Sequence, residues 1–451
     1  MIPAWIRAEP YECWFSLMGS RYRGDFVIVL EFNGQVDAER LDRAVRAAIA
    51  AEPIWGYRFV EQWFYPYWRP STPEELRSLV RVREIENLPA AIYEELLQPI
   101  DAAARVTILR RPAGDALLVR VDHRRGDFTS GKLLLDEIRQ RYQHNVSAPA
   151  ADFIGPVVHR TIRLLRSVTP PERQKQYMRE LKQLQKEESR QVAFSAPVVT
   201  EKDPYSSLRL LRYGTGSADE LTARAFQERA TPSMVLQAAT YFAIRDTLQL
   251  SRQFPVPIVT NVDLRRYLPK DMHPVHAANL VGDAVVAIPW TETEDFSDVL
   301  GLIREQLQQQ RGPEFGIVRS NHPLDVARVL RRTSWIPYGL LRRVVQRVYD
   351  LKPGTPRVAV TDLGLIGAKE EMWGDARLTG GFGTLGICHL PAVYVALTLC
   401  NSRVTLVTGF GPVSFVRELT ERVDHHLSRF VGWTPGAALR EVIEPGTATS
   451  E

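Results

Sequence analysis

The sequence contains little cysteine. Its 451 residues include only three, Cys13, Cys388 and Cys400, and no Cys-x-x-Cys pair. Three thiols cannot build the disulfide framework of a small secreted scaffold. The cysteine content therefore excludes that class of protein and is typical of a chain in the reducing cytoplasm.

Long apolar runs are also absent. No window approaches the roughly 18 uninterrupted apolar residues that a membrane-spanning helix needs. Residues 1–14 show no basic segment followed by an apolar one, which a signal peptide would require. We therefore expect a cytoplasmic protein without a transmembrane segment.

A large excess of charge of one sign is the third absence. The 57 basic and 53 acidic residues leave a net charge of +4, too balanced for a protein that wraps nucleic acid. Hydrophobic residues make up 45% and charged residues 24%, which excludes a disordered chain. At 451 residues the chain exceeds what one hydrophobic core usually holds, so we expect two domains or two fused halves.

Hydrophobic periodicity predicts an α/β protein. In the first half, strands and helices are expected at residues 26–32, 38–52, 106–111, 116–123 and 130–143. In the second half, they are expected at residues 233–250, 255–264, 279–290, 295–311, 357–366, 392–400, 403–410 and 415–431. Residues 170–190 are polar and helix-forming with little apolar face, and their composition makes them a candidate bridge between the halves.

The most informative stretch is residues 122–128, DHRRGDF, a polar run between an apolar strand and an apolar helix. Strand-to-helix junctions often carry function because rigid elements on both sides fix the loop. His123 can gain or lose a proton near neutral pH, and Asp127 is placed to orient it or to anchor the loop. A purely structural histidine remains the alternative.

Two glycine motifs suggest nucleotide binding instead. Residues 126–132, GDFTSGK, match the first part of a phosphate-binding loop, but Leu133 stands where that loop needs a hydroxyl for magnesium. Residues 381–386, GFGTLG, match a dinucleotide-binding pattern, but an extended segment follows where a helix is required. We expect this second motif to form a flexible or tightly turning loop.

The DHRRGDF stretch resembles the His-His-x-x-x-Asp-Gly signature of condensation domains and related acyltransferases of the chloramphenicol-acetyltransferase-like superfamily. Three other segments are similar to parts of that family in the same order. They are the opening strand and helix at 32–59, the Asp-x-Arg segment and following strand at 259–289, and a strand at 358–367. The resemblance covers most of the chain.

The resemblance implies two lobes, each a mixed sheet flanked by helices, with a tunnel between them. The expected N-terminal lobe is 1–190, which carries the motif, and the expected C-terminal lobe is 191–451. It further implies that His123 is the general base and that Asp127 holds the loop through an ion pair with Arg265, or less readily with Arg266. Residues that could line the tunnel are Asp122, Phe128, Asn279, Thr361, Gly383 and His389.

The implied reaction moves an acyl group from a coenzyme A thioester or a phosphopantetheinyl carrier protein to an alcohol or amine, in specialised-metabolite or lipid biosynthesis. It needs a small-molecule acceptor, a possible acyl or peptidyl carrier protein, no bound cofactor, no metal and no nucleic acid. The alternative is a condensation-like fold that no longer transfers acyl groups. Such a protein would serve as a binding platform or catalyse another reaction, such as a cyclisation.

Two positions depart from the signature. Asp122 replaces its first histidine; because neighbours alternate along a strand, Asp122 or His123 should point away from the tunnel. The carboxylate would then raise the pKa of His123 or face solvent. Phe128 replaces its glycine, and Phe resists the close backbone approach and unusual φ that Gly permits. Phe128 could narrow the tunnel, select a smaller acceptor, or indicate that the site has been repurposed.

Each of the other features has a structural and a functional interpretation. The aromatic residues at 63–68 could cover the first sheet or line a site for an apolar substrate. The basic, amphipathic segment 331–350 could be a solvated helix with a buried stripe, or could dock an acidic carrier protein or a membrane. Histidines with further possible roles are His273 and His276, which have metal-like spacing but no third ligand, and His425 and His426, expected at the surface.

Overall fold

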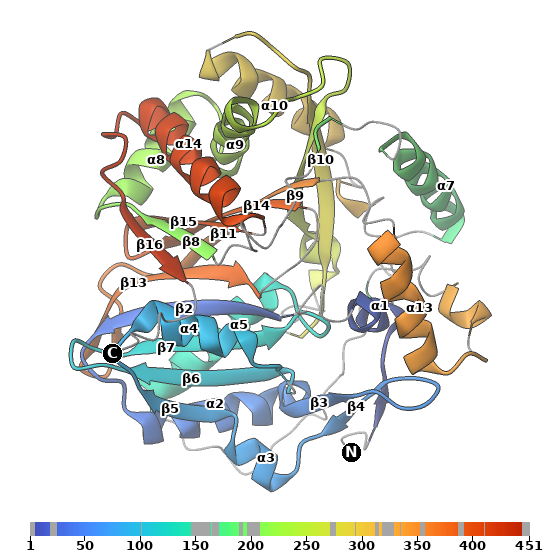
Figure 1. The fold of residues 1–451 in the computed structure, drawn as a ribbon. Helices are drawn as coiled ribbons and strands as arrows, with labels where there is room; N and C mark the ends of the chain where they lie inside the picture. The colour runs from blue at the N-terminus through green and yellow to red at the C-terminus, as the bar shows by residue number, and fades with distance from the viewer. Residues whose placement is uncertain are drawn as a thin grey trace, which may run out of the picture.

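The structure is a computed structural model that describes residues 5–18, 25–100, 102–145, 164, 171–188, 193–195, 208–270, 277–293, 295–311, 315–317, 329–333, 335–351, 357–386, 392–409 and 411–443. Two β-sheets, each with helices packed on it, form the two halves of the molecule (Figure 1). The expected α/β class is confirmed. Among the described helices, none combines the length and the apolar character needed to cross a membrane.

The first sheet has six strands in the order β12-β13-β2-β7-β6-β5. Their bounds are β12 Met372–Trp373, β13 Ala376–Leu385, β2 Asp25–Asn33, β7 Ala116–Asp122, β6 Ala104–Arg110 and β5 Val80–Glu84. β2 is buried on both faces, because Phe26, Ile28 and Leu30 lie in one core and Val27 and Val29 in another. Its position at the centre of the sheet follows from this double burial.

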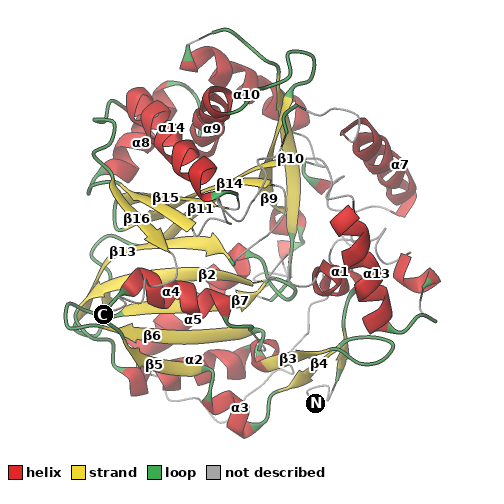
Figure 2. Ribbon diagram, viewed as in Figure 1, coloured by secondary structure: helices red, strands yellow, loops and turns green. Residues whose placement is uncertain are grey.

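Helices cover both faces of the first sheet (Figure 2). α2 (Ala38–Ala51) and α5 (Phe128–Gln143) pack side by side on one face, where Leu41 and Leu134 share a core with Phe26. α4 (Leu88–Leu97) lies on the other face. α2 begins where the sequence predicts, because the Asp37 carboxylate caps it by accepting a hydrogen bond from the Arg40 backbone N–H.

The second sheet has seven strands in the order β10-β9-β11-β14-β15-β8-β16. Their bounds are β10 Val281–Ile288, β9 Val256–Asp263, β11 Arg357–Gly367, β14 Ala392–Cys400, β15 Arg403–Gly409, β8 Leu208–Arg212 and β16 Leu439–Ile443. Its helices are α8 (Ser217–Gln227), α9 (Pro232–Thr247), α10 (Phe296–Gln310) and α14 (Val413–Val431). α9 is buried without interruption from Met234 to Ile244, which explains its continuous apolar sequence.

The two halves share strands and a core. β12 and β13 follow β11 in sequence, yet β13 pairs antiparallel with β2 of the first sheet. A third core joins the two sheets, where Val29 of β2 lies with Leu210 of β8 and Val407 of β15. The lobe boundary at residue 190 stays a prediction, but the first sheet draws strands from both sides of it.

The remaining described elements lie around these sheets. A small three-stranded sheet has the order β1-β4-β3, formed by Ile6–Arg7, Tyr67–Pro70 and Tyr57–Val60. The other helices are α1 Pro10–Met18, η2 Pro53–Gly56, α3 Pro73–Arg77, α7 Pro171–Glu188, η3 Leu264–Tyr267 and α13 Tyr338–Leu351. α7 confirms the helix expected in the polar stretch, and its role as a bridge stays a prediction.

The loop expected from the glycine-rich motif at 381–386 is wrong. Residues 381–385 lie in β13, with Gly381 opposite Leu30 and Gly383 opposite Ile28 of β2. A Cβ atom at Gly381 would lie 2.5 Å from the Val29 carbonyl oxygen. These glycines therefore permit close packing within a strand rather than turning of the chain.

Candidate functional site

The candidate site lies at the junction where β7 ends and α5 begins. After Asp122, the chain turns tightly, because the backbone N–H groups of Arg125 and Gly126 both donate to the Asp122 carbonyl, at 2.9 and 3.1 Å. Asp127 then caps α5: its Oδ1 accepts from the Ser130 backbone N–H at 2.8 Å. This short loop has both ends fixed, so the side chain of His123 is presented from a rigid support.

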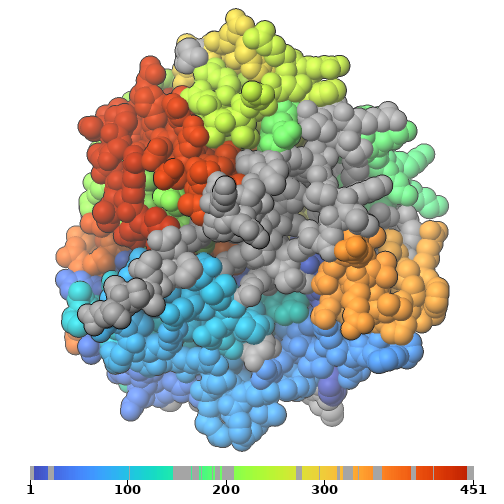
Figure 3. All heavy atoms as spheres, viewed as in Figure 1, coloured from blue at the N-terminus to red at the C-terminus, as the bar shows by residue number. Residues whose placement is uncertain are grey.

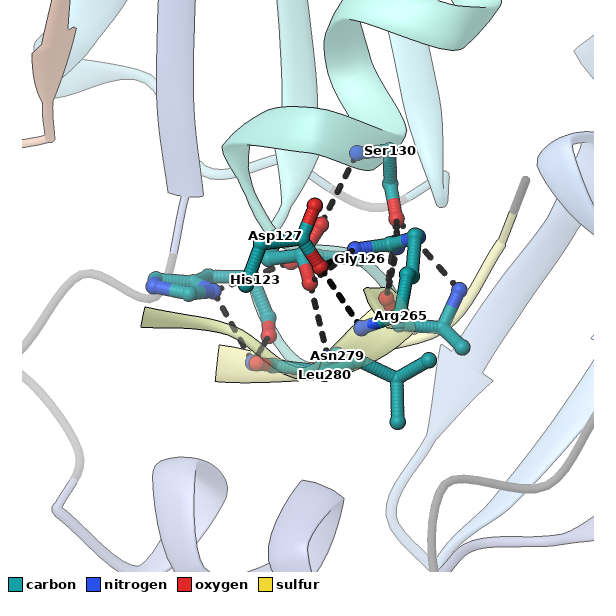
Figure 4. Close-up of polar contacts among 9 residues, drawn as sticks. His123, Gly126, Asp127, Ser130, Arg265, Asn279 and Leu280 are labelled. Carbon is teal, nitrogen blue, oxygen red and sulfur yellow. Dashed lines mark hydrogen bonds and ion pairs between the residues drawn. The ribbon is translucent and has the colours of Figure 1, made fainter. Parts of the chain in front are cut away.

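The hydrogen-bond partners of His123 favour one tautomer of its ring (Figure 4). Its Nδ1 lies 2.9 Å from the Gly126 carbonyl oxygen, which can only accept a hydrogen bond. The Asn279 Nδ2 lies 3.0 Å from the same nitrogen, but it also donates to the His123 backbone carbonyl at 2.8 Å. The arrangement that satisfies both carbonyls has the proton on Nδ1, so the neutral ring carries its basic lone pair on Nε2.

Aromatic rings surround the imidazole. Phe15 of α1 stacks on it with ring centroids 5.1 Å apart, and Phe26 of β2 meets it edge-on at 5.6 Å. Burial lowers the pKa of His123 below its ordinary value of 6.5, outweighing the Gly126 carbonyl and the Asp127 carboxylate, which raise it. The imidazole is therefore neutral at neutral pH and able to accept a proton.

A buried ion pair spans the two sheets beside this histidine. The Asp127 Oδ2 lies 2.8 Å from Nη1 of Arg265, in η3, and accepts from the Leu280 backbone N–H at 2.7 Å. Arg265 also donates through Nη2 to the Ser130 Oγ and to the Ala278 carbonyl, both at 2.8 Å. Both side chains of the pair are under 8% exposed. Nη1 of Arg265 also lies 3.2 Å from Oδ1 of Asp263, whose side chain is more exposed.

The pKa of Asp127 follows from this network. Burial alone would raise the pKa of the carboxyl group. The positive charge of Arg265, with hydrogen bonds from Arg265, Ser130 and Leu280, outweighs burial and holds the pKa below its usual value of 3.8. Asp127 is therefore ionised at neutral pH, and its carboxylate joins the two lobes through Arg265.

Comparison with known proteins gives a fold but no close relative. No protein-family model matches the sequence, and no curated protein matches it. Solved structures do match: the trichothecene 15-O-acetyltransferase from Fusarium sporotrichioides has a TM-score of 0.71 at 13% identity, covering 94% of this chain and 95% of that one. The first condensation domain of the CDA synthetase has a TM-score of 0.64 at 16% identity, with 96% and 97% covered.

A third solved structure, of polyketide synthase associated protein 5 from Mycobacterium tuberculosis, has a TM-score of 0.63 at 16% identity, with 96% and 99% of the two chains covered. The chain has the condensation-domain fold. The resemblance expected from the DHRRGDF stretch is thus confirmed at the level of the two-lobed, chloramphenicol-acetyltransferase-like fold. At these identities the likeness establishes the fold alone.

Within this condensation-like fold, the Asp122 side chain contacts the first lobe and not the imidazole of His123. Its carboxylate binds Arg124, whose Nε lies 2.9 Å from Oδ1, and the Arg124 guanidinium lies 4.0 Å from the centre of the Phe59 ring. Asp122 is buried, so the expected solvent exposure is wrong. Its carboxylate does raise the pKa of His123, as expected, but burial of the imidazole outweighs this influence and the pKa is lowered overall.

Phe128 fits the condensation-like fold without an unusual φ. It is the first residue of α5, and it is not among the described residues with positive φ. Its ring lies against Gly383 of β13, where an added Cβ would come within 2.4 Å of two ring carbons. The missing side chain at Gly383 thus makes room for the ring at Phe128, which explains both residues together.

The phosphate-binding alternative loses its structural basis. In such a loop the N-terminal N–H groups of the helix must point at a phosphate. Here the carboxylate of Asp127 caps α5 and engages the Ser130 N–H, while Leu280 and Arg265 bind its other oxygen. A second anion at this end of the helix would meet a fixed negative charge.

One residue of the network was not expected from the sequence, and another has a different contact from the one expected. Ser130 was missed; its Oγ donates to the Ala278 carbonyl at 2.8 Å and accepts from Arg265. A Ser three residues after an Asp cap was the available signal. Asn279, expected only to line a tunnel, contacts His123 itself. Thr361 is buried in β11, and its place beside a tunnel stays a prediction.

The remaining candidates are histidines and a cysteine elsewhere in the sequence. His273, His276, Cys388 and His389 lie outside the described residues. Within the described ranges, no group of three or more His, Cys, Asp or Glu side chains is arranged to hold a metal ion. His425 is exposed on α14, as expected, whereas His426 is partly buried, with Nε2 2.7 Å from Asp246 Oδ2.

The aromatic cluster at 63–68 divides into two parts. Trp68 is buried in β4 and packs edge-on against Phe59 at 5.2 Å, as a structural cover requires. Trp63 and Phe64 are exposed, so they do not cover the sheet, and a role in lining a site for an apolar substrate stays a prediction.

Proposed function

We propose that this protein is an acyltransferase that moves an acyl group from a thioester to an alcohol or amine, with His123 as the general base. The observation that carries the proposal is the 2.9 Å contact between His123 Nδ1 and the Gly126 carbonyl oxygen. This contact favours the tautomer with the proton on Nδ1, which has its basic lone pair on Nε2. The lowered pKa keeps the ring neutral, as a base must be before it acts.

The reaction follows from this arrangement. Nε2 of His123 takes the proton from the hydroxyl or amine as the oxygen or nitrogen attacks the thioester carbonyl carbon. The tetrahedral intermediate then collapses, the carbon–sulfur bond breaks, and the imidazolium returns the proton to the departing thiol. The products are an ester or amide and a thiol, and the histidine ends in its starting state. No covalent enzyme intermediate is required.

Asp127 and Arg265 act as positioning residues in this proposal. Their ion pair anchors the loop between Asp122 and α5 to the second lobe. Asn279 adds a second restraint through the His123 backbone carbonyl. A base fixed in this way needs little reorganisation when the acceptor arrives, which is the usual source of rate enhancement in such sites.

The donor and acceptor classes rest on the fold and on this chemistry. The similar structures include condensation domains, one of them described as mediating chain release from a polyketide synthase, and an O-acetyltransferase. By analogy, we propose that the acyl donor of this protein is either acyl-coenzyme A or an acyl or peptidyl carrier protein. A role in specialised-metabolite or lipid biosynthesis follows from the same extension.

The test is a transfer assay with acyl-coenzyme A and acyl-phosphopantetheinyl carrier donors against a panel of alcohols and amines, with free thiol and ester or amide product measured together. His123→Ala should lose about 10²–10⁴-fold in rate, the usual contribution of a general base. The matched control is His425→Ala, because that histidine is exposed on α14, away from the β7–α5 junction.

Transfer at the wild-type rate by His123→Ala would overturn the assignment of the base. A wild-type protein that binds an acyl-carrier donor but transfers to none of the acceptors would favour the non-catalytic binding platform. Equal loss in His123→Ala and His425→Ala would show that the rate responds to general destabilisation rather than to the base.

A further inference from the structure

Exposed hydrophobic side chains gather at one place on the described surface. Of the fourteen large hydrophobic residues that are exposed within the described ranges, seven belong to α13, the short segment before it and the β3–β4 loop. Each is at least 52% exposed; they are Trp63, Phe64, Val329, Trp335, Leu340, Val344 and Val348. We call these seven residues, with the arginines described below, the α13 surface.

α13 has two apolar sides. One side is buried: Tyr338 and Leu341 belong to the core of the first lobe, and the Tyr338 hydroxyl donates to the Cys13 carbonyl of α1 at 2.9 Å. The other side carries Leu340, Val344 and Val348 at four-residue spacing, which places them in one row along the exposed face. Core packing therefore explains only half of the apolar content of the helix.

Aromatic side chains lie at the first turn of this helix. The Tyr338 backbone N–H donates to the Trp63 carbonyl at 2.7 Å, which brings the β3–β4 loop against the start of α13. Trp335, three residues earlier, is 76% exposed. Figure 1 shows α13 at the edge of the molecule with the β3–β4 loop beside it, and in Figure 3 its atoms form part of the outer face.

Arginines flank the exposed apolar row. Arg343 and Arg347 are exposed and occupy the neighbouring row of α13, and Arg331 and Arg332 are exposed just before the helix. Arg342, on the side of the β3–β4 loop, forms an ion pair with Glu61 at 2.5 Å. The exposed face therefore combines aliphatic side chains, tryptophan and positive charge.

We infer that the α13 surface docks on an anionic lipid bilayer. An amphipathic helix lies in the interface when its aliphatic and Trp side chains enter the headgroup boundary and its Arg side chains meet anionic lipids. Charge alone would suit an acidic protein equally well. The exposed tryptophans beside the aliphatic row favour a lipid surface, because Trp concentrates at the boundary between water and hydrocarbon.

The test is co-sedimentation of the full-length protein with vesicles of phosphatidylcholine alone or with 30% phosphatidylglycerol, about one lipid in three, a composition chosen to give a strongly anionic surface. The protein should bind the anionic vesicles, weakly at high salt, and its tryptophan emission should shift to the blue. Arg343→Gln with Arg347→Gln should weaken binding about thirtyfold, since each arginine contributes about fivefold near such a surface.

A matched variant separates this surface from net charge. Arg417→Gln with Arg422→Gln removes two exposed arginines from α14, whose described residues include no exposed large hydrophobic side chain. It should bind as the wild type does. Leu340→Gln with Val344→Gln should also weaken vesicle binding at least tenfold, because two buried aliphatic chains are lost from the interface.

Three results would overturn the inference. One is a wild-type protein that stays in the supernatant with anionic vesicles. Another is equal weakening by the α13 and α14 arginine pairs, which would reduce the effect to net charge. The third is a dimer, seen by size-exclusion chromatography and abolished by Leu340→Gln with Val344→Gln, which would assign the surface to a second copy of this chain.

Discussion

The polar segment at the β7–α5 junction forms two buried ion pairs, one within the first lobe and one between the lobes. Asp122 binds Arg124, two residues away, within the first lobe. Asp127 binds Arg265, 138 residues away, in the second lobe. His123 lies between the two aspartates in sequence. The difference shows that one short segment both completes its own lobe and fastens that lobe to the other.

The two pairs also differ in their surroundings. The Arg124 side chain is 18% exposed and lies over the Phe59 ring. Water and this ring can therefore stabilise its charge if the carboxylate is lost. The Arg265 side chain is 7% exposed and donates to four acceptors, of which only Asp263 is itself exposed. A buried charge that loses its partner costs more when no water can replace it. The interlobe pair should therefore be the more sensitive of the two.

The largest effect is expected from Asp127→Ala. It takes from Arg265 its buried carboxylate and leaves only the more exposed Asp263, 3.2 Å from Nη1, as an ionic partner. It also removes the cap of α5 and frees the Leu280 N–H, so the free energy of unfolding should fall by about 3–5 kcal/mol. Denaturant unfolding measures this loss. Transfer activity per folded molecule should also fall at least tenfold, because the loop that carries His123 loses its anchor.

Asp127→Asn sharpens this test, because the amide oxygen can still cap α5 through the Ser130 N–H. It should be intermediate in stability. If Asp127→Ala unfolds at the wild-type denaturant concentration, the ion pair does not hold the lobes together, and the proposed anchor is wrong.

A smaller effect is expected from Asp122→Ala, the matched change on the other side of His123. Loss of the Asp122 carboxylate should reduce the free energy of unfolding by about 1–3 kcal/mol, the usual cost of leaving a buried hydrogen-bonding group without its partner. Transfer activity per folded molecule should stay within a few-fold of the wild type, since Asp122 contacts Arg124 and not the imidazole. Activity lost as severely as in Asp127→Ala would erase the distinction between the two pairs.

Much of this site could be predicted from the sequence, and the omissions have physical reasons. The strand, loop and helix around His123 follow from periodicity and from the Asp127 cap, which are local signals. The choice of Arg265 came from a resemblance, because no local rule links residues 138 positions apart. The role of Asn279 and the ring of Phe128 against Gly383 depend on which strands the fold brings together, as when β13 joins the first sheet. The sequence cannot show such pairings without the fold.

The smallest expected effect concerns the pKa of His123. Because burial holds that pKa below 6.5, the wild-type rate at limiting substrate should stay high as the pH falls to 6.5 and drop only at lower pH, as the ring gains a proton. The unfolded chain takes up this proton first, so the contribution of His123 to stability also declines as the pH falls below 6.5. Phe15→Ala removes a stacked ring from the imidazole and should move the midpoint upward, since solvent then favours the charged form. Asp122→Ala should move it slightly the other way, because the Asp122 charge only raises this pKa, and weakly. A wild-type midpoint above 6.5, or a downward shift in Phe15→Ala, would show that a neighbouring carboxylate and not burial controls the base.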